Sequence, residues 1–439
     1  MNSEHNVQED YVMTDEMEKC IDLAMAGKNI FLTGKAGTGK STLLQYLRLN
    51  VLPENHVALA PTGVAALNIG GMTVHKFFGF QPDITWEHIE SARYNPRNRN
   101  IMKTLKTLII DEVSMIRADM MDCVDRALRK YGPDRNEPFG GVQLVLVGDL
   151  FQLPPIVSRT EDKFMDTHFA TPYFYSSYAM TSVEYSIVEL GEVFRQKEGA
   201  FVDVLNAIRT NDVTDQHLDL LAGSVDPSFV PPKDDIYITL VTTKDAAKII
   251  NSRELDKLPT KLYSSKAEIS GEFSKSEYPA EVEMHFKAGA NIMMLNNDAD
   301  GRWVNGTLAR IESVKHIEQS HGFEVEIFVE ETGKKHTVLP HTWDVKRPRS
   351  IGDRLVYDVV GSFTQLPFAL AWAITIHKSQ GKTFDRVIID LSSPTFSTGQ
   401  LYVALSRCRS LSATILKQPI DRGQIMADER ISEYFAHAA

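Results

Sequence analysis

Cysteine is scarce in this chain of 439 residues, and long apolar runs are absent. Only Cys20, Cys123 and Cys408 occur, far apart and without C-x-x-C spacing, so neither a disulfide framework nor a zinc site is indicated. No apolar run reaches the roughly 18–20 residues that cross a bilayer. The first ten residues are polar and acidic, without a signal or transit pattern. These absences predict a cytoplasmic protein with no membrane partner.

Positive charge is also in deficit, with 47 Lys and Arg against 58 Asp and Glu and a net charge of −11. This balance argues mildly against a phosphate-rich partner, but a local basic groove can still bind one. Hydrophobic residues at 43% and charged residues at 24% are typical of a globular protein. The length predicts two to four domains.

The strongest local pattern lies between Ile30 and Arg48. A short apolar strand enters a stretch with the spacing G-x-x-x-x-G-K-[ST], and a good helix former follows. The glycines permit a backbone whose N–H groups point at phosphate oxygens, and the helix start adds positive charge. We predict a nucleoside-triphosphate site in which Lys40 reaches the β- and γ-phosphates and Ser41 ligates Mg²⁺. The nucleotide-binding residues predicted here are Gly34, Lys35, Ala36, Gly37, Thr38, Gly39, Lys40, Ser41 and Thr42.

Two further apolar strands end in side chains that suit phosphoryl transfer. Residues 107–112 end in Asp111, which we predict as a metal ligand, and Glu112, which we predict to deprotonate the attacking water. An isolated Asp-Glu pair is usually a solvated turn, but the glycine-rich loop upstream favours the catalytic interpretation. Residues 141–149 form a second continuous apolar strand that leads to Gln152, a candidate sensor of the γ-phosphate.

The order of the remaining patterns predicts an α/β protein with two parallel-sheet units. An amphipathic helix at 14–26 precedes the first strand, and a second α/β unit begins near 185 with the strand Val188–Leu190. Residues 262–358 change to short alternating segments separated by turns, which predicts a small inserted β-barrel. The α/β pattern returns at Phe368.

Seven stretches occur in the order found in superfamily 1 helicases, and the chain resembles the Pif1 group, which is related to RecD-type enzymes. The stretches are Gly34–Ser41, Ala60–Gly63, Asp111–Glu112, Gly148–Asp149 with Gln152, Arg195–Gln196, Ile376–Thr383 and Tyr402–Arg407. The region from Met120 to Arg129, followed by Phe139–Gln143 and Gly148–Pro155, is similar to a region characteristic of Pif1 proteins. The resemblance covers nearly the whole chain, which looks like a bare helicase core from a bacterial, phage or trimmed protein.

The resemblance implies two RecA-like domains with ATP bound between them and a small SH3-like β-barrel inserted in the second. Residues 1–184 would form domain 1A, with a small insertion near 62–100. Residues 185–261 and 359–439 would form domain 2A, and 262–358 domain 2B. The implied activity is ATP-dependent 5′-to-3′ translocation on single-stranded DNA with unwinding of duplex, G-quadruplex or RNA–DNA hybrid. DNA repair, recombination and telomere maintenance are the implied processes, with nucleoid association if the source is bacterial.

The resemblance also assigns roles by position. Arg195 and Arg407 would be arginine fingers from the second domain, and Gly381 and Lys382 would contact the nucleotide. The residues implied to grip DNA are Thr62, His75, Lys76, Thr242, Thr243, His377, Lys378 and Ser379. Aromatic candidates for base stacking or strand guidance are Phe77, Phe78, Trp303 and Trp343, with His341 beside them; a core position is at least as good an interpretation of the two phenylalanines. The implied partners are single-stranded DNA and single-strand/duplex junctions, bound by a monomer or a DNA-induced dimer.

One departure and two alternatives stay open. Met17 stands where family members usually carry a glutamine that reads adenine, so the base specificity is undetermined. A DNA-stimulated P-loop ATPase that acts as a switch or loader would share these motifs but lack a strand-separating element. Residues 81–100 and the Pro154–Pro155 loop are the candidates for that element. A small-molecule kinase fits poorly, because a second unit with two arginines has no place in a compact kinase.

Overall fold

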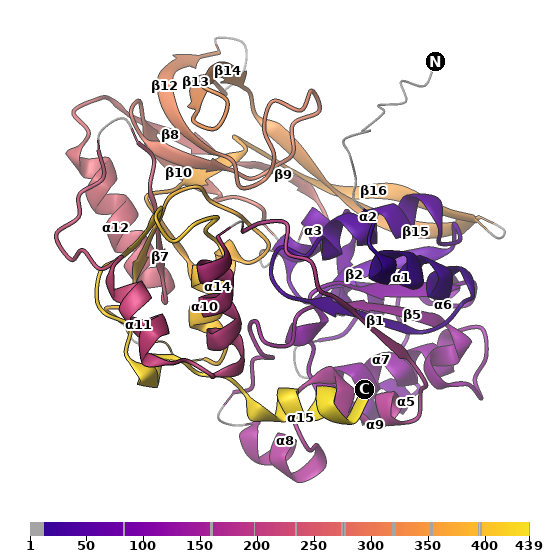
Figure 1. Ribbon diagram of the computed structural model, residues 1–439. Helices are drawn as coiled ribbons and strands as arrows, with labels where there is room; N and C mark the ends of the chain where they lie inside the picture. The colour runs from indigo at the N-terminus through magenta and orange to yellow at the C-terminus, as the bar shows by residue number, and fades with distance from the viewer. Residues whose placement is uncertain are drawn as a thin grey trace.

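The computed structural model describes residues 13–81, 84–158, 161–196, 198–232, 235–273, 275, 278–317, 322–351, 354–393, 395 and 397–438. The side chains of 64, 346–351, 354–357 and 438 lie outside this description. Two α/β units lie side by side, and an antiparallel β region covers one end of both (Figure 1). We call them the first unit, the second unit and the inserted region.

The first unit is built on one parallel sheet with the strand order β3-β2-β4-β5-β1-β6. Its strands are β1 (Ile30–Gly34), β2 (His56–Ala60), β3 (Met72–Thr73), β4 (Thr107–Ile110), β5 (Gln143–Val147) and β6 (Ser186–Leu190). Its helices are α1 (Asp15–Met25), α2 (Lys40–Asn50), α3 (Gly63–Asn68), α4 (Val74–Phe78), α5 (Trp86–Glu90), α6 (Arg99–Met102), α7 (Ala118–Tyr131), α8 (Asp162–His168) and α9 (Tyr178–Thr181). Three 3₁₀ turns complete it, η1 (Val113–Met115), η2 (Pro138–Gly141) and η3 (Phe174–Ser176).

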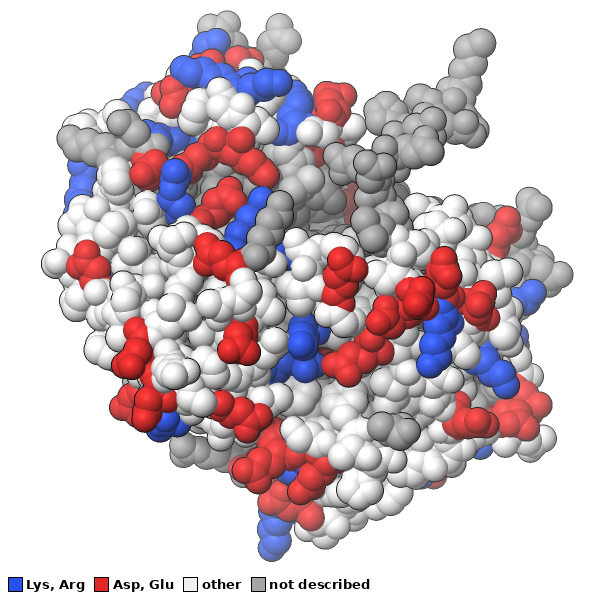
Figure 2. All heavy atoms as spheres, in the orientation of Figure 1, with Lys and Arg blue, Asp and Glu red and all other residues white. Residues whose placement is uncertain are grey.

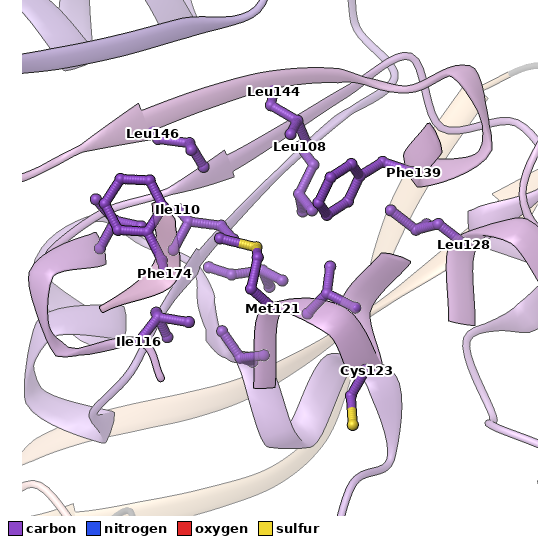
Figure 3. Packing of buried hydrophobic residues seen from close by; sticks show 14 of the residues in the cluster. Leu108, Ile110, Ile116, Met121, Cys123, Leu128, Phe139, Leu144, Leu146 and Phe174 are labelled. Carbon is purple, nitrogen blue, oxygen red and sulfur yellow. The ribbon is translucent and has the colours of Figure 1, made fainter. Parts of the chain in front are cut away.

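Both faces of this sheet are buried, which explains the continuous apolar runs in its strands. Successive side chains of a strand point to opposite faces. Leu108 of β4 and Leu144 of β5 therefore join the cluster under α7, with Met121 and Leu128 of that helix (Figure 3). Ile109, one residue along, packs on the other face with residues of α1 and α2. The alternation fixes the register of the sheet between its helical layers.

The region predicted as characteristic of Pif1 proteins has a structural role. Both carboxylate oxygens of Asp125 accept hydrogen bonds from Arg129 Nε, at 3.0 and 2.8 Å, and one of them also accepts from the Phe139 N–H at 2.6 Å. Phe139 has a φ of 51°, and Gly140 follows with a φ of 66°. A Cβ on Gly140 would lie 2.6 Å from the Leu128 carbonyl oxygen, so only glycine lets this turn close on α7. The motif fastens the end of α7 to β5.

The second unit has a smaller parallel sheet with the order β18-β7-β19-β20. Its strands are β7 (Ile238–Val241), β18 (Ala373–Thr375), β19 (Val387–Asp390) and β20 (Thr414–Leu416). Its helices are α10 (Gly199–Thr210), α11 (Asp215–Ala222), α12 (Lys244–Lys257), α13 (Ile376–Ser379) and α14 (Gln400–Leu405), with the 3₁₀ turn η5 (Arg422–Gln424). Pink and yellow segments alternate in this unit because the chain returns to it after the inserted region (Figure 1).

The strand predicted to open the second unit belongs to the first. Val188–Leu190 lies in β6, which pairs in parallel with β1 from Ile30↔Ser186 to Gly34↔Leu190. A short apolar strand does not carry information about which sheet it will join, and the edge beside β1 was free to accept it. The boundary near residue 185 was therefore placed too early.

The inserted region is antiparallel, and it extends further than predicted. Its strands are β8 (Leu262–Lys266), β9 (Glu268–Gly271), β10 (Glu283–Lys287), β11 (Asn291–Met294), β12 (Leu308–His316), β13 (Phe323–Val329), β14 (Lys334–Val338), β15 (His341–Ile351), β16 (Arg354–Gln365) and β17 (Phe368–Leu370). Between described residues they form sheets with the orders β14-β13-β12-β11-β17, β15-β16-β9 and β10-β8. The predicted limit at 358 cuts through β16, because the long hairpin and the pairing of β17 with β11 were not foreseen. Closure into a barrel stays a prediction.

The last helix, α15 (Glu429–Ala438), leaves the second unit and packs on the first, in contrast to its predicted place in the second domain. The Phe435 ring stacks with Phe31 of β1 at 6.4 Å and with Phe151 at 6.0 Å between centroids. Tyr434 stacks on Tyr175 at 4.0 Å. Figure 1 shows this helix beside α8 and α9. The apolar face of α15 finds its partner across the unit boundary, so the chain ties the two units together.

Candidate functional site at the interface of the two units

The glycine-rich loop after β1 has the backbone expected of a phosphate cradle. Gly37 and Gly39 have φ values of 84° and 87°, and Gly39 caps α2, whose first residue is Lys40. Lys40 Nζ donates to the carbonyl oxygens of Gly34 at 2.7 Å and Lys35 at 2.8 Å. Burial lowers the pKa of Lys40, and the carboxylates of Asp149 and Glu112 oppose that shift. The loop therefore holds one ammonium group at its centre, with Ser41 and Thr42 exposed at the helix start.

Two carboxylates follow β4, as predicted. Asp111 Oδ1 accepts from the Glu112 N–H at 2.9 Å, and Glu112 has a φ of 52°, a left-handed conformation rare for this residue. Burial, followed by the neighbouring Asp111 carboxylate, raises the pKa of Glu112 to about 7. Burial also raises the pKa of Asp111. A strained, buried carboxylate beside a phosphate loop suits a general base, and its neighbour suits a cation ligand.

The second unit presents two arginines to this loop, the buried Arg407 and the half-buried Arg195. Arg407 is 1% exposed, and its guanidinium donates to the Val403 and Lys382 carbonyls at 3.0 and 3.3 Å and to Ser406 Oγ at 2.8 Å. Arg195 Nη1 donates to the Ser406 carbonyl at 3.2 Å. Burial, and next the charge of Arg407, lowers the pKa of Arg195 to about 9. Two cations held close together at this interface form a site that an anion would stabilise.

Hydrogen bonds join the units at the loop and at Glu112. The Ala36 N–H donates to the Tyr402 hydroxyl at 2.9 Å, and the Phe194 N–H donates to the Gly37 carbonyl at 2.9 Å. Gln380 Nε2 donates to Glu112 Oε2 at 2.9 Å. Tyr402 and Gln380 lie within motifs noted in the sequence, but no role was predicted for them. The second unit thus touches both the phosphate loop and the predicted general base.

Arg209 was missed altogether by the sequence analysis. It comes from the end of α10, is 7% exposed, and pairs with Asp149 at 3.4 Å and Glu189 at 3.6 Å. Its guanidinium lies 4.1 Å from the Phe151 ring centroid. Asp149 Oδ2 in turn accepts from Gln152 Nε2 at 3.2 Å. A basic residue in the last turn of a helix is ordinary, so only the tertiary structure distinguishes Arg209.

Gln152 is buried in a loop that the second unit approaches closely. A Cβ on Gly399 would lie 2.1 Å from the Gln152 carbonyl oxygen and 2.5 Å from that of Phe151. Gly399 also has a φ of 71°, so glycine is required here on both counts. The turn before α14, which carries Tyr402, therefore packs directly on the loop that carries the predicted γ-phosphate sensor.

The predicted nucleotide contacts Gly381 and Lys382 directly follow Gln380, which bonds Glu112. Lys382 Nζ donates to Asn305 Oδ1 of the inserted region at 2.6 Å, and burial lowers its pKa to about 8. Its carbonyl oxygen accepts from Arg407. Lys382 thus positions Arg407 through its backbone and binds the inserted region through its side chain.

The DNA-binding residues predicted in the first unit lie after β2 and β3. The exposed Thr62 caps α3, with Oγ1 accepting from the Ala65 N–H at 3.2 Å. His75 and Lys76 are carried by α4, and burial lowers the pKa of His75. The neighbouring Phe77 and Phe78 are both 0% exposed and belong to the core, so the stacking interpretation is wrong for both.

In the second unit, the predicted DNA contacts divide between surface and interior. Lys378 is exposed, and Thr243 caps α12 by accepting from the Ala246 N–H at 3.2 Å. Thr242 is buried, with Oγ1 donating to the Ser393 carbonyl at 3.1 Å, and Ser379 Oγ donates to the Ile376 carbonyl at 2.7 Å. Burial, and then the charge of Lys244, lowers the pKa of His377. Lys378 is thus open to solvent, whereas the buried hydroxyl groups of Thr242 and Ser379 bond to carbonyl oxygens of the protein itself.

The tryptophan candidates of the inserted region are buried. Trp303 is 5% exposed, and its Nε1 donates to Asn296 Oδ1 at 3.1 Å. Trp343 is 7% exposed and packs edge-on with His341 and Phe363. These indoles stabilise the inserted region, and only the half-buried His341 is partly open to solvent.

Met17 lies beside the phosphate loop, where the family usually has glutamine. Its side chain is 2% exposed, and its methyl carbon would lie 3.1 Å from a Cβ on Gly39. Phe194 of the second unit approaches the same glycine at 3.9 Å. The wall next to Gly39 is therefore apolar on both sides.

The charge distribution agrees with an anion site between the units. On the face shown in Figure 2, Lys and Arg atoms gather between the two units, and Asp and Glu atoms form a band over α1. Within the described ranges, no group of three or more His, Cys, Asp or Glu side chains is arranged to hold a metal ion. None of the helices described is both long enough and apolar enough to span a bilayer.

Comparison with known proteins gives one consistent result. A family model described as PIF1-like helicase matches residues 9–226, and one described as UvrD-like helicase C-terminal domain matches residues 370–413. The chain is 35% identical over 413 residues to the ATP-dependent DNA helicase PIF1 of Xenopus laevis, covering 91% of this chain and 60% of the relative. The chain thus spans about three fifths of the length of that curated relative.

Solved structures match over nearly the whole chain. The Bacteroides sp. Pif1 in complex with ADP-AlF4 is 35% identical, with a TM-score of 0.86 and coverage of 98% of this chain and 97% of that one. Bacteroides Pif1 bound to single-stranded DNA, 34% identical, has a TM-score of 0.71 at coverages of 98% and 97%. The parallel-sheet α/β fold with RecA-like domains is confirmed, and this chain belongs to the PIF1-like helicase family.

Proposed function

We propose that this chain is an ATP-dependent DNA helicase that moves 5′-to-3′ along single-stranded DNA and unwinds duplex. The observation that carries the proposal is the interface itself. Lys40 and Glu112 of the first unit lie opposite Arg195 and Arg407 of the second, with direct hydrogen bonds between the units. A nucleotide bound there would link the spacing of the two units to its hydrolysis.

The residues of the first unit fit a magnesium nucleotide. The left-handed glycines and the start of α2 form a cradle for phosphates, and Ser41 and Asp111 offer the oxygen ligands that Mg²⁺ prefers. Bound there, Mg²⁺ would neutralise charge on the β- and γ-phosphate oxygens. Lys40 would exchange its carbonyl partners for phosphate oxygens, and Glu112 would take the proton of the attacking water.

The residues of the second unit would complete the site. Arg407, held by backbone carbonyls of its own unit, would direct its guanidinium at the γ-phosphoryl oxygens, and Arg195 would act beside it. Gln152, bound to the buried Asp149, would report the presence of the γ-phosphate to the DNA-binding side. Closing and opening of the interface would then move two gripping surfaces relative to each other.

Single-stranded DNA and its junctions with duplex are the proposed substrates. The exposed candidates Thr62 and Lys378, with His75, Lys76 and Thr243, offer hydroxyl groups, helix starts and cations for phosphates without reading bases. The Bacteroides relative was solved with single-stranded DNA. G-quadruplexes and RNA–DNA hybrids are further substrates that the same grip allows.

The deciding experiment is single-turnover unwinding of a short duplex that carries either a 5′ or a 3′ single-stranded tail, with Mg²⁺ and ATP. We expect product only from the 5′-tailed substrate and none from Lys40→Ala on either one. DNA-stimulated ATP hydrolysis without strand separation on either tail would instead support the switch or loader. Hydrolysis that does not respond to DNA would contradict both.

A further inference from the structure

A basic pocket of about 350 Å³ lies between α6 and the end of α7 in the first unit. It is lined by Asn95, Arg99, Lys103, Lys130, Tyr131, Gly132 and Arg135. Four of these seven side chains are cationic, and no carboxylate lines the pocket. In a chain with a net charge of −11, such a concentration of positive charge is unexpected.

The four cations are not neutralised by nearby acids. Among the described residues, none of them forms an ion pair, whereas their neighbours Arg126 and Arg129 pair with Glu90 and Asp125. Asp134, next to Arg135 in the sequence, accepts instead from the Asn136 N–H at 2.9 Å and does not line the pocket. A positive field of this kind attracts an anion, and phosphate is the anion that several converging cations bind best.

Part of the positive charge is fixed in place. Lys130 Nζ donates to the carbonyl oxygens of Ile89 at 2.8 Å and Ser91 at 2.7 Å, and Arg99 Nη1 donates to Asn95 Oδ1 at 2.8 Å. These partners are uncharged, so they orient the cations without cancelling them. Lys103 and Arg135 are exposed at the rim, where they can adjust to a ligand.

The wall of the pocket is joined to the helix that carries His75 and Lys76. Asn98 Nδ2 donates to the Phe77 carbonyl at 2.8 Å, and the Tyr94 hydroxyl donates to the Phe78 carbonyl at 2.8 Å. The Tyr131 hydroxyl donates to the Tyr94 carbonyl at 2.6 Å. A ligand in the pocket would therefore have a fixed position relative to the proposed strand-binding helix α4.

The pocket nevertheless lies at the opposite edge of the sheet from the proposed strand path. Thr62 follows the carboxyl end of β2, whereas Lys103 precedes the neighbouring β4 and Arg135 precedes β5. Because all neighbouring strands are parallel, these positions are separated by the length of a strand, about 16 Å for five residues. A nucleic acid gripped along that path would have to contact the pocket with a different part of the molecule.

We propose that this pocket binds backbone phosphates of the duplex arm at a single-strand/duplex junction. The inference rests on the proposed helicase function and adds a second contact to it. Residues 94–99 of its wall belong to the segment predicted from sequence to separate strands. Holding the duplex beside that segment would keep the junction in register with the strand gripped by α4, without reading its sequence.

The test compares three labelled probes, a 5′-tailed duplex, the same tail alone and the same duplex without a tail, titrated by anisotropy at several salt concentrations. The variant is Lys103→Ala with Arg135→Ala, and the control is Lys163→Ala with Lys248→Ala, which removes two exposed lysines elsewhere. We expect the variant to lose about tenfold in affinity for the tailed duplex and its salt slope to fall by about 2. The tail alone should bind within about twofold of the unchanged protein.

Two results would overturn the proposal. An unchanged salt slope on both duplex probes would mean that no duplex phosphate enters the pocket. An equal loss on the tail alone would assign the pocket to the strand path. If the protein without substitutions failed to bind the tail, this result would contradict the proposed helicase function. Binding of the untailed duplex would still test the pocket in that case.

Discussion

The phosphate loop and the surface of the second unit that faces it contribute to one site but are built in different ways. The loop occupies nine consecutive residues, 34–42, and works mainly through backbone geometry. The opposing surface is made of Arg195, Arg209, Gln380, Tyr402 and Arg407, which come from four separate stretches and work through side chains. The phosphate loop can be recognised from a short sequence motif. The residues of the opposing surface are far apart in the sequence and come together only in the folded protein.

This difference suggests that the two sides serve different steps. Substitutions other than proline leave the backbone N–H groups in place, so we expect phosphate binding by the loop to depend little on single side chains other than Lys40. The opposing side chains approach only when the units meet, so they suit a step that requires closure. Variants on the two sides should therefore separate nucleotide binding from hydrolysis.

The largest expected effect comes from Arg407. Replacing it with Gln removes the charge that we propose faces the γ-phosphate, and should lower kcat for DNA-stimulated hydrolysis by about 10³-fold or more. Nucleotide binding, measured with a fluorescent analogue, should change far less because the loop is intact. Arg407→Lys, which keeps the charge but lacks the planar fork, should recover little activity.

Since Arg407 is completely buried, its variants need a check of folding by thermal unfolding. Arg195→Gln provides the comparison, because Arg195 is held by one backbone carbonyl where Arg407 is held by two and a hydroxyl. A kcat unchanged in Arg407→Gln, with normal folding, would show that the second unit does not complete the site.

Lys40→Ala tests the other side of the comparison. Its ammonium group is the one that the loop itself holds at 2.7 and 2.8 Å from its carbonyls. Loss of that charge should lower kcat by about 10²- to 10³-fold and also weaken nucleotide binding, unlike the arginine variants. Lys28→Ala, at an exposed lysine just before β1, is the matched control. Equal loss of affinity in Lys40→Ala and Arg407→Gln would remove the distinction between the two sides.

The same contrast explains what the sequence could and could not predict. The apolar runs of β1, β2, β4 and β5 have the pattern of strands buried on both faces, so the first sheet was foreseen. Strand β6 and helix α15 were assigned to the wrong unit. Their apolar patterns show that the segments are buried, but not which unit they pack against. The end of the inserted region was placed too early because the long hairpin β15–β16 was not recognised, although Gly352-Asp353 between its strands is a hairpin turn signal.

The candidate site divides in the same way. Every residue of the phosphate loop could be named from spacing, since the chemistry and the spacing coincide there. Arg209 could not, because a cation at the end of α10 looks like any helix terminus until Asp149 is found 3.4 Å away. Phe77 and Phe78 show the reverse error. In the sequence, a phenylalanine pair that is exposed for base stacking cannot be distinguished from a pair that is buried in the core.

Arg209 provides a third, smaller effect that sharpens the comparison. Arg209→Gln leaves the buried Asp149 without its cation, and Asp149 also holds Gln152. We expect kcat to fall by about 10- to 100-fold and the unfolding temperature to drop, because an unpaired buried charge is destabilising. Arg253→Gln, an exposed ion-paired arginine of α12, is the control.

A double-mutant cycle separates positioning from stability in this case. If Arg209 acts through Gln152, the double variant Arg209→Gln/Gln152→Ala should lose no more kcat than the single variant Gln152→Ala. Additive losses would mean that Arg209 acts independently of the sensor. Arg209→Lys should restore the unfolding temperature more than it restores kcat, since the stacking on Phe151 needs a planar group.

The smallest effect should come from the Tyr402 hydroxyl, which the second unit places on the phosphate loop. Tyr402→Phe removes the acceptor of the Ala36 N–H and keeps the ring in its core position. A buried hydrogen bond contributes about 1 kcal/mol, so kcat should fall by about two- to tenfold with nucleotide affinity unchanged. Tyr178→Phe, which loses a hydroxyl bond to the His168 carbonyl far from the loop, should leave kcat as it is.

A loss in Tyr402→Phe as large as that in Arg407→Gln would mean that the loop is shaped by the second unit and is not preformed. The two sides would then be one cooperative structure, and the separation of binding from hydrolysis would fail.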